Sequence, residues 1–308
     1  MKISSKLIKS KALDLGFHKI GIAKAVSTPN EREKLELWLS EHKNGSMEWL
    51  YKRKDERGDI YNYFKEAKSV VSVGLNYYTG YKQKDINSDY KFSNYAWGMD
   101  YHNIVKGKLY QLLNWINAIE KGIKGIVCSD TSPVMDKVWA QRSGLGWIGK
   151  HTNLITKDYG SWIFLGELIL DVELQYDLNF KEDLCGTCTA CIDACPTRAL
   201  EEYQINAEKC ISYLNIEHRG EFSEENKGLH GWIYGCDICQ NVCPWNSKFA
   251  KETDEELFKP KEEILNWSNE DWQNLDEKKF RELFKGSSVK RTKFVGLKRN
   301  ITSNKNIK

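Results

Sequence analysis

The spacing of apolar residues along the first half of the chain predicts alternating helices and strands. Apolar positions recur at near-helical spacing over residues 3–15 and 103–120, which predicts two amphipathic helices. Short β-branched and apolar runs at 20–23, 69–75 and 125–128 predict buried strands. Thr28, Pro29 and Glu31 form a capping-box pattern and predict a helix to about Ser40. The pattern therefore predicts a mixed α/β domain with a sheet core and helical cover.

Residues 144–170 differ in character from the segments before them. A glycine-dense stretch at 144–150 precedes two apolar segments, at 153–156 and 162–170. Glycine permits close backbone approach and positive φ, which would serve a large cofactor and a tight turn equally well. We expect an α/β domain over residues 1–179, a cysteine-rich module over 180–246, and a helical segment with a basic tail over 247–308.

Composition narrows the class of protein. The 308 residues are 41% hydrophobic, and no stretch approaches the ~20 apolar residues of a membrane helix. The first residues lack the pattern of a secretory signal, so we expect a cytoplasmic protein with no membrane partner. Net charge is only +3, but residues 285–308 contain eight Lys or Arg and no Asp or Glu. Such a tail is compatible with phosphate contacts, although composition alone favours a solvated terminus.

Eight of the nine cysteines lie between residues 185 and 243. The first run is Cys185-x2-Cys188-x2-Cys191-x3-Cys195-Pro196, and the second is Cys236-x2-Cys239-x3-Cys243-Pro244, with Cys210 between them. Thiolates two residues apart wrap one cubane, whereas the cysteine that precedes proline ligates the other cluster. The spacing therefore predicts two [4Fe–4S] clusters with crossed ligands.

The second run lacks its first ligand, because Ile233 occupies the corresponding position. Cys210 is the unassigned cysteine nearby, so it completes the second set. We assign one cluster to Cys185, Cys188, Cys191 and Cys243, and the other to Cys195, Cys210, Cys236 and Cys239. Zinc is the weaker alternative because it favours separated CxxC pairs. Disulfides would need an oxidising compartment.

Several segments together resemble one family, the epoxyqueuosine reductases, which carry out the last step in the synthesis of the tRNA nucleoside queuosine. The matching segments are residues 95–102 (YAWGMDYH), 130–137 (DTSPVMDK), 144–151 (GLGWIGKH), 160–167, 185–188 and 234–246 (YGCDICQNVCPWN). The resemblance covers most of the chain. Many members carry a C-terminal helical-repeat extension, and this chain ends where that extension would begin.

The resemblance implies a cobalamin in an α/β domain related to the nitroreductase-like scaffold of reductive dehalogenases. A cobalamin-binding D-x-H-x-x-G signature begins at Asp100 and His102 but fails at Val105. We therefore expect no histidine lower ligand to cobalt from this segment. The residues that the resemblance and its motifs place near the corrin or substrate are Arg57, Tyr101, His102, Lys150, His151, Leu154 and Ser161.

Asp130 matches the catalytic aspartate of that family and is the expected proton donor. Burial beside a corrin should raise its pKa above the ~3.9 of free aspartate. Without the resemblance, Asp130 would be interpreted as a helix N-cap. Asp136 is the less favoured donor, expected on a helix surface or in a salt bridge, and Cys128 is expected to be a buried thiol.

The implied reaction removes an epoxide oxygen as water, with two electrons and two protons. The expected partners are a tRNA bearing epoxyqueuosine and an external low-potential electron donor, with the protein acting as a monomer. Two alternative functions remain, a corrinoid dehalogenase acting on a small molecule and a non-catalytic electron carrier. The expected phosphate contacts are Lys290, Arg291, Lys298 and Arg299.

Overall fold

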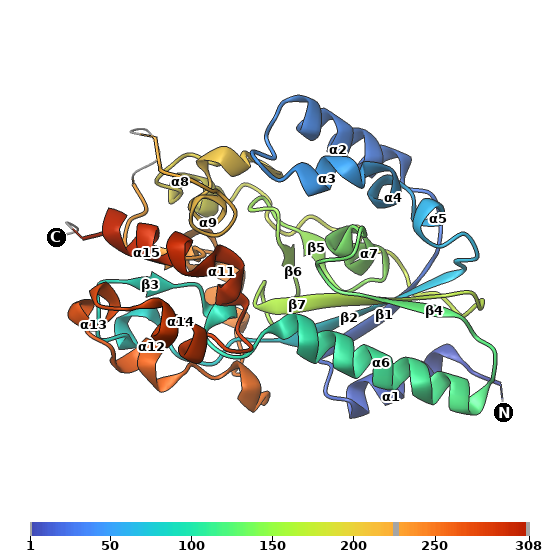
Figure 1. The fold of residues 1–308 in the computed structure, drawn as a ribbon. Coiled ribbons are helices and arrows are strands. Elements are labelled where there is room, and N and C mark those ends of the chain that lie inside the picture. Colours follow the sequence, from blue (N-terminus) through green and yellow to red (C-terminus); the bar gives the residue numbers. More distant parts are fainter. Residues whose placement is uncertain (1, 224–227, 306–308) are drawn as a thin grey trace.

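A four-stranded antiparallel sheet in the order β1-β2-β7-β4 forms the core of the N-terminal part (Figure 1). The computed structural model describes residues 2–223 and 228–305, so Lys308 of the basic tail lies outside the described residues. The strands are β1 (Lys19–Lys24), β2 (Ser69–Asn76), β4 (Gly125–Cys128) and β7 (Ile163–Leu170). The predicted strands and the mixed α/β class are confirmed.

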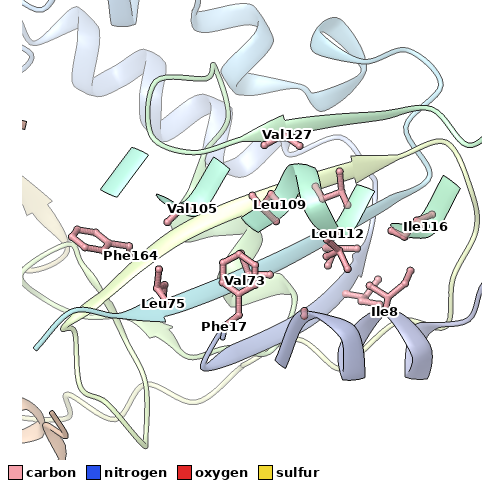
Figure 2. Packing of buried hydrophobic residues seen from close by; sticks show 14 of the residues in the cluster. Ile8, Phe17, Val73, Leu75, Val105, Leu109, Leu112, Ile116, Val127 and Phe164 are labelled. Carbon is pink, nitrogen blue, oxygen red and sulfur yellow. The ribbon is translucent and has the colours of Figure 1, made fainter. Parts of the chain in front are cut away.

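Two helices, α1 (Ser5–Asp14) and α6 (Tyr101–Ile119), cover one face of the sheet. The buried residues of α6 recur at intervals of four, three and four, which places them on one stripe. Figure 2 shows these side chains against alternate residues of β2. The predicted helices at 3–15 and 103–120 are confirmed. The packed residues include Ile8, Val73, Leu75, Val105, Leu109, Leu112 and Ile116.

The opposite face packs against α7 (Asp136–Arg142) and the chain around α5 (Ile60–Tyr63). The other helices in this region are α2 (Pro29–Ser40), α3 (Glu48–Lys52) and α4 (Lys54–Gly58). The predicted range of α2 is confirmed, but its capping box is wrong. The Thr28 hydroxyl donates to the Gly58 carbonyl at 2.9 Å, and Glu31 pairs with Arg142. Both side chains of the expected cap therefore bond to residues outside this helix.

The glycine-dense segment forms tight turns against its own neighbouring strand. It leads into the hairpin of β5 (Trp147–Ile148) and β6 (Leu154–Ile155). A Cβ at Gly146 would lie 2.0 Å from the Ile155 carbonyl oxygen, and Gly144 has a φ of +79°. These two glycines therefore serve the turn, which was one of the two interpretations of this stretch.

The cysteine-rich module follows as short elements around two helical turns that pack together, α8 (Ala190–Asp193) and α10 (Ile238–Asn241). Between them lie a small hairpin and a helix. The remaining elements are β8 (Leu200–Glu201), β9 (Gln204–Ile205), α9 (Ile211–Ile216), β10 (Trp232–Tyr234) and α11 (Pro244–Phe249).

The C-terminal helices form a second hydrophobic core together with a segment from the N-terminal half of the chain. Residues 86–97, expected in the first domain, pack with these helices through Phe92, Trp97 and Trp272. Within that segment, β3 (Lys91–Phe92) pairs in parallel with β10. The expected boundary at residue 179 therefore does not separate the packing units. The helices are α12 (Glu262–Asn266), α13 (Asn269–Gln273), α14 (Glu277–Leu283) and α15 (Lys293–Ser303). No helix in the described ranges is long and apolar enough to cross a membrane.

Candidate active site and cluster cavities

A cavity of about 1360 Å³ lies where the sheet domain, the cysteine-rich module and the C-terminal helices meet. Its lining includes Asp130 and His102 from the sheet domain, Cys236 and Cys239 from the module, and Lys290 from the C-terminal segment. Acid–base side chains, cysteines and a basic residue therefore share one space. A cavity of this size exceeds the range usual for small ligands.

His102 lies between two carboxylates at the start of α6. Its Nδ1 lies 2.6 Å from Oδ1 of Asp100, and its Nε2 lies 2.9 Å from Oδ2 of Asp130. Asp100 is also the N-cap of α6 and accepts the backbone N–H of His102. The N–H of Asp100 in turn donates to the carbonyl of Gly286 at 2.7 Å. The helix cap therefore fixes the imidazole, and the C-terminal segment fixes the cap.

The surroundings of His102 favour its protonated form. Burial alone would lower the pKa of the imidazole, but hydrogen bonds from the ring to Asp100 and Asp130 raise this pKa to about 9. The ring also stacks on Tyr101 at 4.0 Å between centroids, and Tyr101 stacks on Phe164 at 4.1 Å. His102 is therefore a positively charged, oriented donor at neutral pH.

Asp130 follows β4 in a left-handed conformation with φ of 51°. Its side chain is 62% exposed, but that exposure is toward the cavity. Burial would raise the pKa of this carboxyl, yet the hydrogen bond and charge of His102 outweigh burial and lower the pKa. The expectation of a raised pKa is therefore wrong for this arrangement. The N-cap interpretation also fails, because α7 begins only at Asp136.

Arg57 approaches Asp130 from α4. Its Nη1 donates to the Val134 carbonyl at 3.3 Å, and its guanidinium lies over the ring of Trp49. Burial lowers the pKa of Arg57, although the charges of Asp136 and Asp130 oppose this effect. Its buried Nε has no hydrogen-bond partner in the described residues. Arg57 therefore has a free donor beside the cavity.

The four remaining residues that were expected near the corrin or substrate do not all line the same cavity. His151, Leu154 and Ser161 line the large cavity. Ser161 is also tied to the cysteine-rich module, since its hydroxyl donates to Gln240 Oε1 at 2.8 Å. Lys150 lines a smaller cavity instead, and its Nζ lies 2.6 Å from Glu202. Lys150 therefore lies outside the lining of the large cavity, and its contact with corrin or substrate stays a prediction.

The cysteines fall into two groups around different cavities. Cys185, Cys188, Cys191 and Cys243 line the smaller cavity, of about 170 Å³. Cys210, Cys236 and Cys239 line the large one. Cys195 lines neither cavity. After the larger effect of burial, its charge helps to raise the pKa of Cys210, so the two residues lie near each other. None of the nine cysteines forms a disulfide, and Cys128 is buried as expected.

Two buried donors near the smaller cavity have no hydrogen-bond partner in the part of the chain that the structure describes. These are Nε1 of Trp147 and Nε2 of His151. The Nδ1 atom of His151 accepts the N–H of Asn153, so Nε2 carries the ring proton. Burial lowers the pKa of His151 to about 4, which keeps the ring neutral. Such N–H groups suit the sulfur atoms of a cluster.

The basic tail is only partly available for phosphate. Lys298 donates to the carbonyls of Gln273 and Leu275, at 2.5 and 3.0 Å. Arg299 donates to the carbonyls of Leu214, His218 and Gly220. The expectation of phosphate contacts at Lys298 and Arg299 is therefore wrong, because both side chains are committed within the molecule. Lys290 and Arg291 line the large cavity, and Arg291 also pairs with Glu217.

Three polar residues of the site received no role from sequence reasoning. Asp100 orients His102, Lys106 donates to the Thr131 hydroxyl at 2.7 Å, and Lys137 donates to the Thr152 carbonyl at 2.8 Å. Asp100 could have been found, since it lies three residues before the predicted helix and aspartate is a common N-cap. The two lysines carried none, because their partners are distant in sequence.

Comparison with known families explains the cysteine-rich module. Residues 184–246 match the model of the 4Fe-4S double cluster binding domain, so the chain binds two [4Fe–4S] clusters. Among the described residues, no three His, Cys, Asp or Glu side chains converge as ligands of one metal ion. The double-cluster domain, the acid–base site and the α/β sheet define an iron–sulfur oxidoreductase.

The relatives identify the kind of oxidoreductase. Residues 57–131 match the family model "Epoxyqueuosine reductase QueG, DUF1730". The epoxyqueuosine reductase of Cellulophaga algicola is 47% identical over 96% of both chains, and that of Leadbetterella byssophila is 47% identical over 98% of both. The chain belongs to the epoxyqueuosine reductase family.

Solved structures agree with this assignment. A selenomethionine-labelled epoxyqueuosine reductase has a TM-score of 0.87 at 28% identity. An epoxyqueuosine reductase bound to an epoxyqueuosine-modified tRNA-Tyr stem loop has a TM-score of 0.85 at 27% identity. Each alignment covers 97% of this chain and 80% of the solved chain. The predicted family and fold are therefore confirmed.

Proposed function

We infer that this chain reduces epoxyqueuosine to queuosine in tRNA. The observation that carries this inference is the single cavity that joins the His102–Asp130 pair to Cys236 and Cys239. Conversion of an epoxide to an alkene consumes two electrons and two protons and releases water. Electrons arrive from the cluster side of the cavity and protons from the opposite side. The carrier and dehalogenase alternatives are set aside by the family relationship.

The crossed ligand sets predicted from spacing remain our proposal for the clusters. One set comprises Cys185, Cys188, Cys191 and Cys243, and the other comprises Cys195, Cys210, Cys236 and Cys239. The grouping of cysteines around the two cavities supports this division. The second cluster then lies beside the reaction, and the first lies farther along the electron path.

We also propose that the large cavity holds cobalamin. Its volume and the free buried Nε of Arg57 fit a large cofactor with polar substituents. Both ring nitrogens of His102 are engaged by carboxylates, which agrees with the expected lack of a histidine ligand from this segment. When bound, cobalamin supplies the electron-rich cobalt chemistry that opens the epoxide, while the protein orients and protonates.

The proton source is the His102–Asp130 pair acting together. The ring of His102 holds a proton at neutral pH, and Asp130 presents its carboxyl to the cavity. A proton that passes from Nε2 through Oδ2 of Asp130 reaches the substrate oxygen. Arg57 lies near Asp130 and stabilises its ionised form after transfer. Tyr101 keeps the imidazole oriented by stacking.

The tRNA lies over the opening between the C-terminal segment and the sheet domain in this proposal. Lys290 and Arg291 line that side of the cavity and are the proposed phosphate contacts. The electron donor is an external low-potential reductant that reaches the cluster of Cys185. We expect a monomer that works in the cytoplasm, where its tRNA substrate is found.

The function is tested by incubating the anaerobically reconstituted chain with an epoxyqueuosine-modified stem loop and a strong reductant. The nucleosides are then analysed after digestion. Conversion to queuosine supports the proposal, and corrin absorption bands in the same sample support the cobalamin assignment. A sample that carries both clusters and corrin yet leaves the epoxide intact would overturn the proposed function. A chain that shows only iron–sulfur absorption would overturn the cobalamin assignment.

A further inference from the structure

A buried glutamate lies behind the catalytic loop with no role in the reaction described so far. Glu167 is on the central strand β7, where it pairs in register with Cys128 of β4. Its side chain points to the α7 face of the sheet and is 0% exposed. Neither carboxyl oxygen finds a hydrogen-bond donor among the described residues. An ionised carboxylate left in this state would be strongly disfavoured.

The carboxyl group that faces Glu167 belongs to Asp136, at the first position of α7. The expectation that Asp136 lies on a helix surface is wrong, because its carboxyl turns inward to this pair. One oxygen of Asp136 accepts the backbone N–H of Asp130 at 3.2 Å. Two ionised carboxylates repel each other, whereas one shared proton turns their contact into a hydrogen bond.

The surrounding charges place that proton on Glu167. Burial raises the pKa of both carboxyls, and the charge of Asp136 raises the pKa of Glu167 further, well above its ordinary value. For Asp136, the hydrogen bond with Glu167 opposes burial and lowers the pKa, whereas the charge of Asp130 raises it. The charged and titratable groups that face the pair are Arg57, Tyr101, Cys128, Asp130 and Lys137.

We propose that Glu167 is a permanently protonated positioning residue that holds the catalytic loop through Asp136. Its O–H donates to Asp136, and Asp136 accepts the N–H of Asp130. This chain of hydrogen bonds keeps Asp130 in its left-handed conformation, which is unfavourable for a residue other than glycine. The carboxyl of Asp130 then remains within reach of His102. The proposal deepens the proposed function, because it rests on Asp130 as part of the proton path.

Infrared spectroscopy of the full, cofactor-loaded chain tests the proton directly. A protonated carboxyl has a carbonyl band distinct from those of carboxylates. We expect the wild type to show a carboxylic-acid band at pH 8 that Glu167→Gln removes. Glu66→Gln, at an exposed acid, is the matched control and should leave the band unchanged.

The turnover of two Glu167 variants then tests whether Glu167 positions the loop that carries Asp130. Glu167→Gln keeps an N–H donor for Asp136, so we expect turnover within about threefold of the wild type. Glu167→Met has similar size but no donor, and we expect turnover to fall about 10- to 100-fold, as loss of reacting geometry does. Iron content and circular dichroism check that both variants fold. If Glu167→Met does not fold, the infrared band and the activity of Glu167→Gln decide the matter.

Two results would overturn the proposal. One is a wild-type spectrum at pH 8 with no carboxylic-acid band sensitive to Glu167→Gln. The other is a folded Glu167→Met variant as active as Glu167→Gln. The infrared result does not depend on turnover. An intact band in a chain that cannot reduce epoxyqueuosine would therefore refute the proposed function and leave the protonated pair standing.

Discussion

Nε2 of His102 lies 2.9 Å from a carboxyl oxygen of Asp130, and the two residues, 28 positions apart, belong to different elements of the sheet domain. The first begins a long helix, and the second follows an edge strand. Each changes the protonation of the other, since the pKa of the ring is raised and that of the carboxyl is lowered. The proposed general acid is therefore a pair, and its proton is held on the nitrogen of His102.

Asp130→Asn should abolish most turnover and leave the cofactors bound. An amide cannot pass a proton from His102 to substrate, and general acid catalysis typically contributes about 10²- to 10⁴-fold. We expect a loss on that scale in stem-loop reduction, measured beside iron content and corrin absorbance. Asp89→Asn, an exposed position away from the cavity, is the matched control. A fully active Asp130→Asn variant would refute the role.

The raised pKa of His102 predicts a pH dependence of stability. A group whose pKa is higher in the folded state stabilises that state fully below its unfolded pKa, near 6.5, and loses this contribution as pH rises through about 9. We expect the free energy of unfolding of the wild type to fall by about 1–3 kcal/mol between pH 6 and 10. The range extends down to about 1 kcal/mol because solvent screens the interactions of the partly exposed ring. Thermal unfolding of wild type and His102→Gln over this range measures the difference. Equal losses in both proteins would contradict this origin.

Single cysteine substitutions should remove one cluster at a time. Cys243→Ser should lose the cluster of Cys185, and Cys236→Ser should lose the cluster beside the large cavity. Each variant should contain about four of the eight irons expected for two cubanes. Cys128→Ala is the control, since this buried thiol lines neither cavity. If Cys243→Ser instead removed the cluster of Cys236, with Cys185→Ser sparing it, the crossed arrangement would be wrong.

Neutralising Lys290 should weaken tRNA binding in a salt-dependent way. Its side chain is exposed at the cavity, so removing its phosphate interaction should flatten the slope of log K against log salt by about 0.7 to 0.9. Lys278→Gln, on the outer side of α14, should not change this slope. Lys298→Gln should leave the slope intact and lower thermal stability, because Lys298 caps two carbonyls. An unchanged salt slope in Lys290→Gln would show that Lys290 is a solvated surface residue that does not contact phosphate.

The sequence predicted best those features that depend on short-range periodicity. The strands followed from their β-branched runs, α6 from its apolar stripe, and the cluster number from cysteine spacing. Features that depend on distant partners were missed. Thr28 donates to Gly58 rather than capping its own helix, and Asp130 pairs with His102. Lys298 donates to the last carbonyl of α13 and to that of Leu275 just beyond it. A pKa depends on such neighbours, so its direction at Asp130 could not be deduced from local sequence.

The hydrogen bond from Asp100 to Gly286 connects the reaction chemistry to the far end of the chain. Residues 286–291 form the basic wall of the cavity, and their first carbonyl holds the cap on which the imidazole depends. The proposed phosphate contacts and the alignment of the proposed acid therefore depend on one backbone hydrogen bond. A variant with shortened or replaced C-terminal helices should therefore lose turnover even though His102 and Asp130 are unchanged.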